Sequence, residues 1–276
     1  MERTGRGAVA TSTNFIERRL PGQVFGIKYG IAVLTLDRPR AKNAISRALL
    51  DAFRDKIEAL RYDPETRVVI LRSGVERVFC AGADLKERAT MTPSEVTQFL
   101  TRLRRAFRDL ETLPMPTIAA IDGAALGGGL EMALCCDFRV AGPGALVGLP
   151  ETRLAIIPGG GGTQRLTRLI GPGKAKELIY TGRNLKHTEA EAYGIVTRST
   201  LEDAYTESLN LAREILPQGP IAIRMAKLAI DRGGPLDLDA GLDFEQACYA
   251  QVIPTEDRLE GLKAFREQRK PVYQGR

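Results

Sequence analysis

The chain has 276 residues, of which 43% are hydrophobic and 27% charged, which suits one large domain or one domain with a small appendage. No apolar run approaches the roughly 20 residues that span a bilayer, so no membrane span is predicted. The single histidine excludes a multi-histidine metal site and argues against a Ser-His-Asp triad, so no metal site is predicted. The net charge of +6 leaves two interpretations open, a solvated basic surface or attraction for a polyanion such as a phosphorylated cofactor or a nucleic acid.

The N-terminal residues and the cysteines indicate the compartment in which the protein works. Residues 1–13 carry two arginines and one acid, which fits the remnant of an organelle transit peptide or a disordered end, and we expect residues 1–20 to be flexible. The four cysteines form no C-x-x-C pair and favour a reducing compartment. We therefore expect the mitochondrial matrix for a eukaryotic source and the cytoplasm otherwise.

Strand and helix patterns alternate in the first half of the chain. Short buried strands are predicted at Ile31–Leu36, Val68–Leu71 and Thr117–Ile121. Ser46 can cap a helix with apolar residues along one face. Thr92 begins a capping box with proline at the first helical position, and this predicts a second amphipathic helix.

The second half of the chain becomes increasingly helical. We predict a helix over residues 128–135, a strand over 138–141 and a helix that begins after Gly162 and ends near Gly171. Further helical patterns occupy residues 174–181, 202–216, 220–231 and 256–268. An α/β core over residues 21–215, followed by a helical region over 216–276, fits this order.

Two glutamates stand next to runs of glycine. Glu131 ends a segment that contains Gly127-Gly128-Gly129, and Glu151 precedes the run Gly159–Gly162. Glycine lets the backbone approach a ligand closely, and a helix that begins there directs N–H groups at developing negative charge. Two carboxylates beside such donors indicate proton transfer next to an oxyanion.

Other interpretations of the glycines are weaker. The run Gly159–Gly162 is followed by Thr163-Gln164-Arg165 rather than Gly-Lys-Ser/Thr, so it is not a phosphate-binding loop. No G-x-G-x-x-G is completed, which excludes the dinucleotide fingerprint. Tight turns or close packing explain either run alone, but they do not explain why both runs lie beside glutamates.

Several segments together resemble the crotonase (enoyl-CoA hydratase/isomerase) superfamily. They are Phe79–Lys86, Leu126–Glu131, Pro150–Arg165 and Leu259–Glu267, and the resemblance covers residues 25 to 274. Within the superfamily the chain is most similar to the 3-methylglutaconyl-CoA hydratase group. The resemblance implies a spiral of ββα repeats, a C-terminal helical trimerisation region, assembly as a homotrimer or dimer of trimers, and an acyl-CoA substrate with no permanently bound cofactor.

The resemblance also implies catalytic roles. The family's two oxyanion-hole N–H groups fall on Ala83 and Gly128, where they would hold the thioester oxygen as it becomes enolate-like. Glu131 would activate water for attack at Cβ, Glu151 would exchange a proton at Cα, and the N–H of Gly159 would help to hold the water. Since close like charges push one pKa upward, one carboxyl can keep the proton that the other lacks.

The expected CoA contacts lie in three parts of the chain. Long cations suit phosphates, and the resemblance adds backbone near the adenine and an aromatic residue that reaches a neighbouring subunit's CoA. The expected contacts are Arg40, Lys42, Ala81, Gly82, Lys86 and Phe265. The family's lysine three residues after the aromatic position is Gln268 here, so the resemblance does not extend to that part of the inter-subunit contact.

These residues bear on three classes of function. The first is a hydro-lyase that hydrates a short-chain or branched 2-enoyl-CoA in fatty-acid or leucine catabolism, with 3-methylglutaconyl-CoA as one candidate substrate. Isomerases and decarboxylases of the superfamily share the oxyanion hole but generally lack the carboxylate pair. A catalytically weak paralogue has no residue-level support, because both glutamates and both glycine motifs are intact.

The remaining class is RNA binding, which one relative is described as having through lysines on its first helix. The corresponding helix here keeps Arg47 but has Asp51 and Asp55 at lysine positions. Carboxylates repel a phosphate backbone, so no RNA partner is predicted.

Overall fold

The computed structural model describes residues 15–20 and 30–276. In this part of the chain the strands form two sheets, one in the order β1-β2-β3-β5-β7-β10 and one in the order β4-β6-β8-β9. The strands are β1 (Phe15–Leu20), β2 (Ile31–Leu36), β3 (Val68–Ser73), β4 (Val78–Cys80), β5 (Thr117–Ile121), β6 (Ala124–Leu126), β7 (Phe138–Ala141), β8 (Leu146–Gly148), β9 (Asn184–Lys186) and β10 (Arg198–Ser199).

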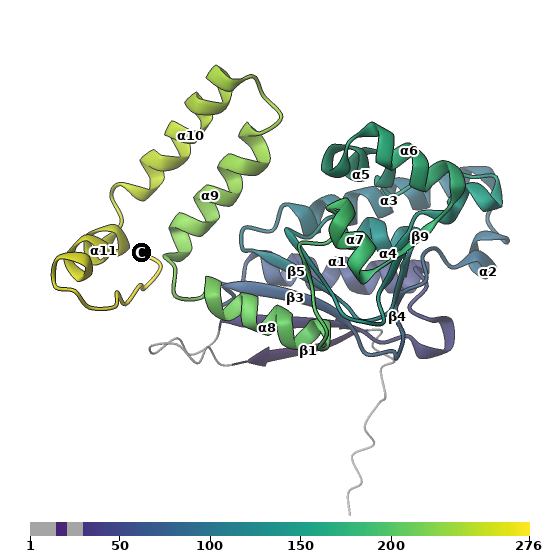
Figure 1. Ribbon diagram of the computed structural model, residues 1–276, viewed down its shortest axis with the longest axis horizontal. Helices are drawn as coiled ribbons and strands as arrows, with labels where there is room; N and C mark the ends of the chain where they lie inside the picture. The colour runs from purple at the N-terminus through teal and green to yellow at the C-terminus, as the bar shows by residue number, and fades with distance from the viewer. Residues whose placement is uncertain (1–14, 21–29) are drawn as a thin grey trace, which may run out of the picture.

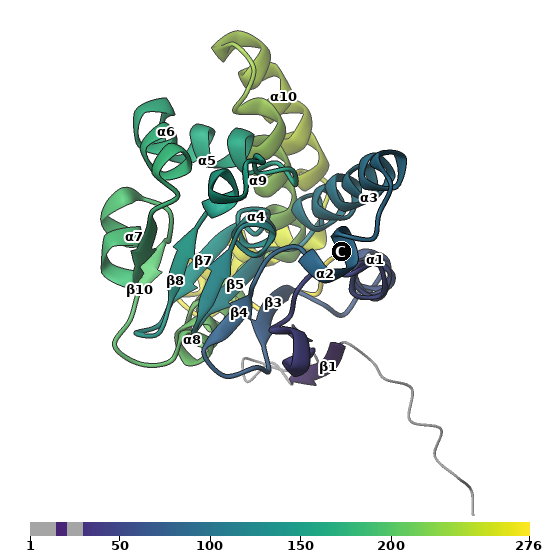
Figure 2. The same cartoon turned by 90° about the vertical axis from the view of Figure 1, so that its right-hand side faces the viewer.

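Helices cover these sheets and form the whole C-terminal part (Figures 1 and 2). The α-helices are α1 (Arg47–Arg61), α2 (Leu85–Arg88), α3 (Pro93–Glu111), α4 (Gly128–Ala133), α5 (Gly162–Ile170), α6 (Pro172–Thr181), α7 (His187–Tyr193), α8 (Ala204–Ile215), α9 (Pro220–Gly233), α10 (Leu238–Val252) and α11 (Glu256–Arg266). Two short 3₁₀ helices, η1 (Pro39–Ala41) and η2 (Pro150–Leu154), lie in loops. In the described residues no helix combines the length and apolar character of a bilayer span.

The larger sheet has a parallel centre. Strands β2, β3, β5 and β7 pair in parallel, and β1 joins β2 antiparallel at the edge. Residues 15–20 lie in the segment that was predicted to be flexible. In the structure they form strand β1, because β2 offers a free edge. The four predicted strands are present at β2, β3, β5 and β7.

The core lies on both faces of this sheet. Side chains such as Ile70 and Ile118 point to the face covered by α8, whereas Val69, Leu71 and Ala119 belong to the main cluster with α1 and α3. This alternation follows from the period of two along a strand. The last three helices extend away from the sheets (Figure 1).

The smaller sheet positions the candidate site. Strands β4, β6 and β8 are neighbours and run parallel, so their carboxyl ends meet at one edge. The segments that follow them contain Ala83, Gly128 and Glu151 respectively. Loops at the carboxyl ends of parallel strands commonly form ligand sites. Three motifs that are far apart in the sequence are thus brought together.

The predicted helix starts are confirmed in detail. The Oγ of Ser46 accepts a hydrogen bond from the N–H of Leu49 at 3.1 Å, and Thr92 forms the complete capping box with Glu95. Helix α10 was not predicted, since its apolar residues do not form one clear stripe. The short strands of the smaller sheet were also not predicted, because three residues are too few to show an alternating pattern.

Candidate active site

Two backbone N–H groups lie side by side at the ends of β4 and β6. A Cβ built on Gly128 would lie 3.7 Å from the nitrogen of Ala83. Gly128 is the first residue of α4, so its N–H has no acceptor within the helix. The N–H of Ile45 donates to the carbonyl of Gly82, and the carbonyl of Ile45 accepts from the N–H of Asp84. This parallel bridge leaves the N–H of Ala83 pointing to its other side, where Gly128 lies.

Gly82 is required for this approach. Its φ of +97° lies in the region that favours glycine, and an added Cβ would come within 2.8 Å of the carbonyl oxygen of Leu126. The backbone between Gly82 and Ala83 can therefore turn its N–H toward the start of α4. The two predicted oxyanion donors, Ala83 and Gly128, are brought together.

Glu131 is the more buried of the two predicted carboxylates, with only 2% of its surface exposed. It lies in the first turns of α4, and its Oε1 accepts hydrogen bonds from the N–H groups of Gly160 and Gly162, at 2.8 and 2.7 Å. Burial raises the pKa of Glu131, and these two donors oppose that rise. The glycine run therefore binds one glutamate instead of binding phosphate.

Two arginines fix the glycine run from behind. Arg104 donates through Nε to the carbonyl of Gly159 at 2.7 Å, and Arg165 donates to the carbonyl of Gly160 at 3.1 Å. Arg165 is itself held by Glu111 through two hydrogen bonds of 3.0 Å. Both guanidinium charges favour the ionised form of Glu131. These three residues were not predicted as site residues, because no local pattern joins α3 to α5.

Glu151 lies in η2 and faces the start of α4. Its Oε1 would be 3.0 Å from a Cβ on Gly127, and its buried Oε2 has no hydrogen-bond partner in the described part of the chain. Burial, with a smaller contribution from the charge of Glu131, raises the pKa of Glu151 to about 7. At neutral pH one carboxyl of the pair can thus hold a proton while the other is ionised.

Five of the six predicted CoA residues lie in the two segments beside this site, and the sixth, Phe265, does not. The N–H of Ala81 donates to the carbonyl of Lys42 at 3.1 Å, so the segment before α2 and the loop around η1 are adjacent. Arg40, Lys42 and Lys86 are exposed. Phe265 lies on α11 and is 87% exposed, and α11 is at the opposite end of the molecule from α2 (Figure 1).

A buried asparagine holds the η1 loop in place. The Nδ2 of Asn43 donates to the Oγ of Ser73 at 2.8 Å and to the carbonyl of Phe79 at 2.9 Å, and its Oδ1 accepts from the N–H of Arg38. The loop cations thus stand on a fixed backbone. In the residues described here no group of three or more His, Cys, Asp or Glu side chains could hold a metal ion.

Comparison with known proteins places the chain in a family. The family model described as enoyl-CoA hydratase/isomerase matches residues 26–276. The chain belongs to the enoyl-CoA hydratase/isomerase family. It is 55% identical to human mitochondrial methylglutaconyl-CoA hydratase over 89% of this chain and 74% of the relative. It is 50% identical to a putative enoyl-CoA hydratase/isomerase of Bacillus subtilis, over 89% of this chain and 95% of the relative.

A solved structure agrees with this assignment. An enoyl-CoA hydratase from Bacillus anthracis superposes with a TM-score of 0.90 at 46% identity, covering 95% of this chain and all of that one. The predicted crotonase-like α/β fold is confirmed, and so is the prediction of an enzyme of the enoyl-CoA hydratase, hydro-lyase type.

Replacing Gly160 by alanine is expected to damage this site. The added Cβ would lie 2.6 Å from Oε2 of Glu131 and 2.8 Å from a ring carbon of Phe107. Because both neighbours are buried, the glycine run has to move and its hydrogen bonds to Glu131 lengthen. We expect kcat/KM for crotonyl-CoA to fall about 10²-fold, in keeping with the effect of a misplaced catalytic group. Gly173→Ala, where a Cβ meets no atom within 4 Å, is the matched control and should keep full activity.

Proposed function

We propose that this protein reversibly adds water across the 2,3 double bond of a short-chain or branched 2-enoyl-CoA, with 3-methylglutaconyl-CoA as the preferred substrate. The arrangement of Glu131 and Glu151 beside the N–H groups of Ala83 and Gly128 carries the proposal. Superfamily members that lack such a carboxylate pair catalyse other reactions. The 55% identity to a protein named methylglutaconyl-CoA hydratase supports the choice of acyl group.

In the proposed mechanism the two carboxyls, Glu131 and Glu151, together carry one proton. The N–H groups of Ala83 and Gly128 donate to the thioester oxygen, and the positive end of α4 stabilises the negative charge that develops there. Glu131, ionised, takes a proton from the water that attacks Cβ. Glu151, protonated, gives its proton to Cα. The N–H of Gly159 helps to hold the water.

Substrate binding is proposed to use the cations on the open side. Arg40, Lys42 and Lys86 would contact the phosphates of CoA, and the backbone of Ala81 and Gly82 would line the adenine side. Their exposure and the hydrogen bond between the two segments support a shared phosphate region. The acyl-CoA is a substrate, and no permanently bound cofactor is proposed.

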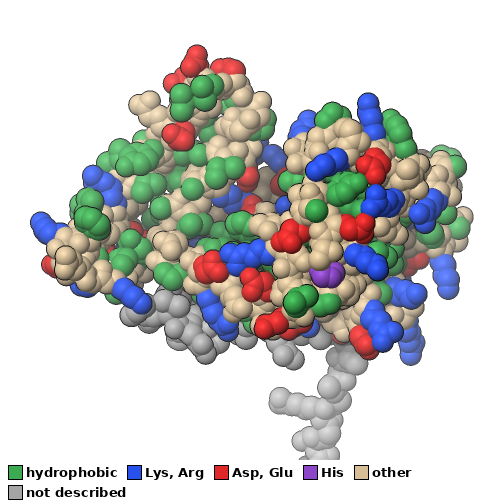
Figure 3. All heavy atoms as spheres, in the orientation of Figure 1, with side chains coloured by type: hydrophobic (Ala, Val, Ile, Leu, Met, Phe, Trp, Pro, Cys, Tyr) green, Lys and Arg blue, Asp and Glu red, His purple; other side chains and the backbone are tan. Residues whose placement is uncertain are grey.

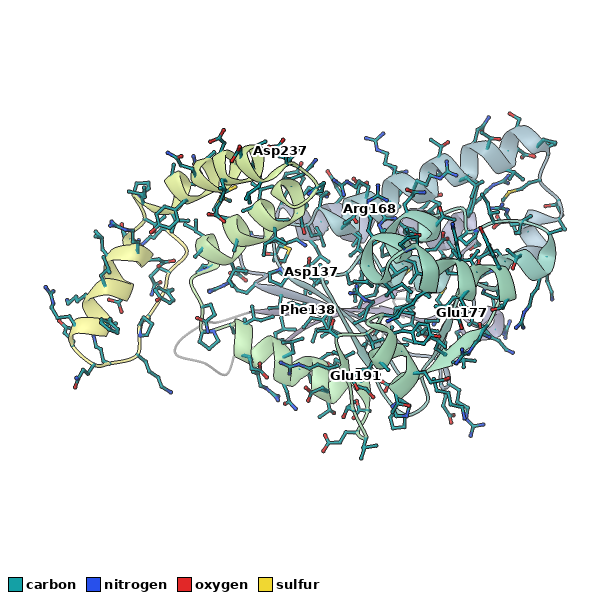
Figure 4. All side chains as sticks on the ribbon, turned by 45° about the horizontal axis from the view of Figure 1, so that its top comes forward. Asp137, Phe138, Arg168, Glu177, Glu191 and Asp237 are labelled. Atoms are coloured by element: carbon teal, nitrogen blue, oxygen red, sulfur yellow. The ribbon has the colours of Figure 1, made fainter. Side chains whose placement is uncertain are left out.

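Assembly into a homotrimer or a dimer of trimers is proposed for the C-terminal region, residues 216–276. Apolar side chains gather on α9 and α10 in Figure 3, and residues such as Leu238 and Leu262 are more than half exposed. A groove of about 720 Å³ separates α9 from the core, with Asp137, Phe138 and Arg168 on its wall (Figure 4). Exposed apolar patches of this kind mark association surfaces. Phe265 would then reach the CoA of a neighbouring subunit, without the lysine that Gln268 replaces.

The relatives also bear on the location of the protein, and the charges on α1 bear on RNA binding. Mitochondrial relatives support the mitochondrial matrix for a eukaryotic source. On α1, Arg47 is paired with Glu95, and Asp51, which stands at a lysine position, is paired with Arg102. No RNA partner is proposed.

The test is hydration of crotonyl-CoA and 3-methylglutaconyl-CoA, followed as loss of absorbance of the conjugated thioester. We expect turnover of both, with a higher kcat/KM for 3-methylglutaconyl-CoA. Protein that binds CoA but turns over neither thioester would contradict the proposal.

A further inference from the structure

One face of α3 lies along the glycine run that binds Glu131. Its side chains recur at intervals of four, three and four residues, which places them on one side of the helix: Leu100, Arg104, Phe107 and Glu111. Leu100 and Phe107 contact the run, since Cβ atoms added at Gly159 and Gly160 would lie 2.9 and 2.8 Å from them. The apolar side chains therefore pack against the glycine run, and an arginine stands between them.

That arginine, Arg104, binds the run through one backbone oxygen. Its Nε donates to the carbonyl of Gly159 at 2.7 Å, and its side chain forms no ion pair within the described residues. Arg165, the other cation behind the run, is paired with Glu111 through two hydrogen bonds of 3.0 Å, which balance its charge. Of the two arginines, Arg104 is thus the one whose charge no carboxylate partner balances.

A single peptide unit joins Arg104 to Glu131. The carbonyl of Gly159 and the N–H of Gly160 belong to the same peptide, and this N–H donates to Oε1 of Glu131 at 2.8 Å. The Nε of Arg104 and the Oε1 of Glu131 are therefore at most about 8 Å apart. A peptide whose carbonyl accepts from a cation is polarised, so its N–H donates more strongly. The separation is also shorter than the screening length of about 10 Å at 0.1 M salt.

Other groups also act on Glu131. Burial raises its pKa, and the N–H groups of Gly162 and Gly160, followed by the charges of Arg165 and Arg104, lower it. The titratable and charged side chains around it are Arg104 and Glu111 on α3, Arg165 on α5, Glu151 in η2 and Cys135 directly after α4. Burial raises the pKa of Cys135 well above its usual range, so this thiol stays neutral. The two arginines are thus the cations that oppose the effect of burial in the described part of the chain.

We infer that Arg104 is a positioning residue for hydration: through the peptide between Gly159 and Gly160 it fixes the orientation of Glu131 and favours the carboxylate form that activates water. The inference rests on the proposed hydratase function. A purely structural tie to the carbonyl of Gly159 needs a hydrogen-bond donor but no charge. The role inferred for Arg104 needs both, and this difference can be measured.

The test separates the charge of Arg104 from its hydrogen bond, with crotonyl-CoA as substrate. Arg104→Met removes both, Arg104→Gln keeps an N–H donor without the charge, and Arg104→Lys keeps a donor and the charge. We expect kcat of Arg104→Met to fall about 10- to 30-fold, somewhat less than for a fully misplaced catalytic group, with the dissociation constant for CoA within about threefold of wild type.

The pH dependence carries the decisive readout. The acidic limb of kcat/KM, where the carboxyl pair takes up its second proton, should move to higher pH in Arg104→Met and in Arg104→Gln. The reason is that the lost charge no longer favours the ionised form of Glu131. Arg104→Lys should keep the acidic limb of the wild-type protein.

Arg105→Met is the matched control. It removes the same charge from the next position of α3, where Arg105 is exposed and its side chain forms no hydrogen bond or ion pair in the residues that the structure describes. Both its kcat and its acidic limb should match those of the wild-type protein.

Three outcomes overturn the inference while the hydratase function stands. They are an unchanged acidic limb in Arg104→Met, the wild-type limb in Arg104→Gln, and an equal shift of the limb in Arg105→Met. If Arg104→Met does not fold, Arg104→Gln against Arg104→Lys decides, because both keep a donor and only one keeps the charge. Wild-type protein that hydrates no 2-enoyl-CoA contradicts the hydratase function, and this inference with it.

Discussion

Glu131→Gln is expected to lower kcat/KM for crotonyl-CoA by about 10³-fold, within the range that general acid–base groups contribute. The amide has almost the same shape as the carboxylate, and its oxygen can still accept from the N–H groups of Gly160 and Gly162. It cannot take a proton from water. The loss should therefore appear in kcat, with the dissociation constant for CoA within threefold of wild type.

Glu177→Gln is the matched control for this substitution. Glu177 is an exposed carboxylate on α6, and its partners are Arg183 and Tyr193 rather than residues of the candidate site. Its variant should retain wild-type kcat/KM. If Glu131→Gln kept more than a tenth of the wild-type activity, Glu131 could not be the group that activates water.

The sequence indicated the residues that the candidate site brings together more clearly than it indicated the short strands that support them. Glu131, Glu151 and both glycine runs carry strong local patterns, and the structure brings all of them to one edge of the smaller sheet. The strands β4, β6 and β8 that achieve this have three residues each, so their sequence periods could not be recognised. Their register depends on neighbours elsewhere in the chain.

The supporting charges were also beyond sequence reasoning. Glu111 and Arg165 are separated by 54 positions, and only the packing of α3 against α5 brings them together behind Gly160.

The two carboxyls should behave as one titrating pair, and the pH dependence of activity measures this. Hydration and dehydration both start from the pair carrying a single proton, and the overall equilibrium releases none. Both kcat/KM profiles should therefore fall above an apparent pKa of about 7, as Glu151 loses its proton. The same raised pKa means that the folded state holds a proton the unfolded chain has lost, so this contribution to stability disappears as pH rises through about 7.

Glu151→Gln tests this assignment directly. The variant should lose about 10³-fold in kcat/KM, because an amide cannot exchange a proton at Cα. Its remaining activity should no longer fall near pH 7, because the carboxyl that titrates there is gone. Stability measured by urea unfolding should also vary less between pH 5 and pH 8 than in wild type. A variant that still showed the wild-type decline above pH 7 would place the titrating group elsewhere, and Glu151 would then be a packing residue rather than the proton donor to Cα.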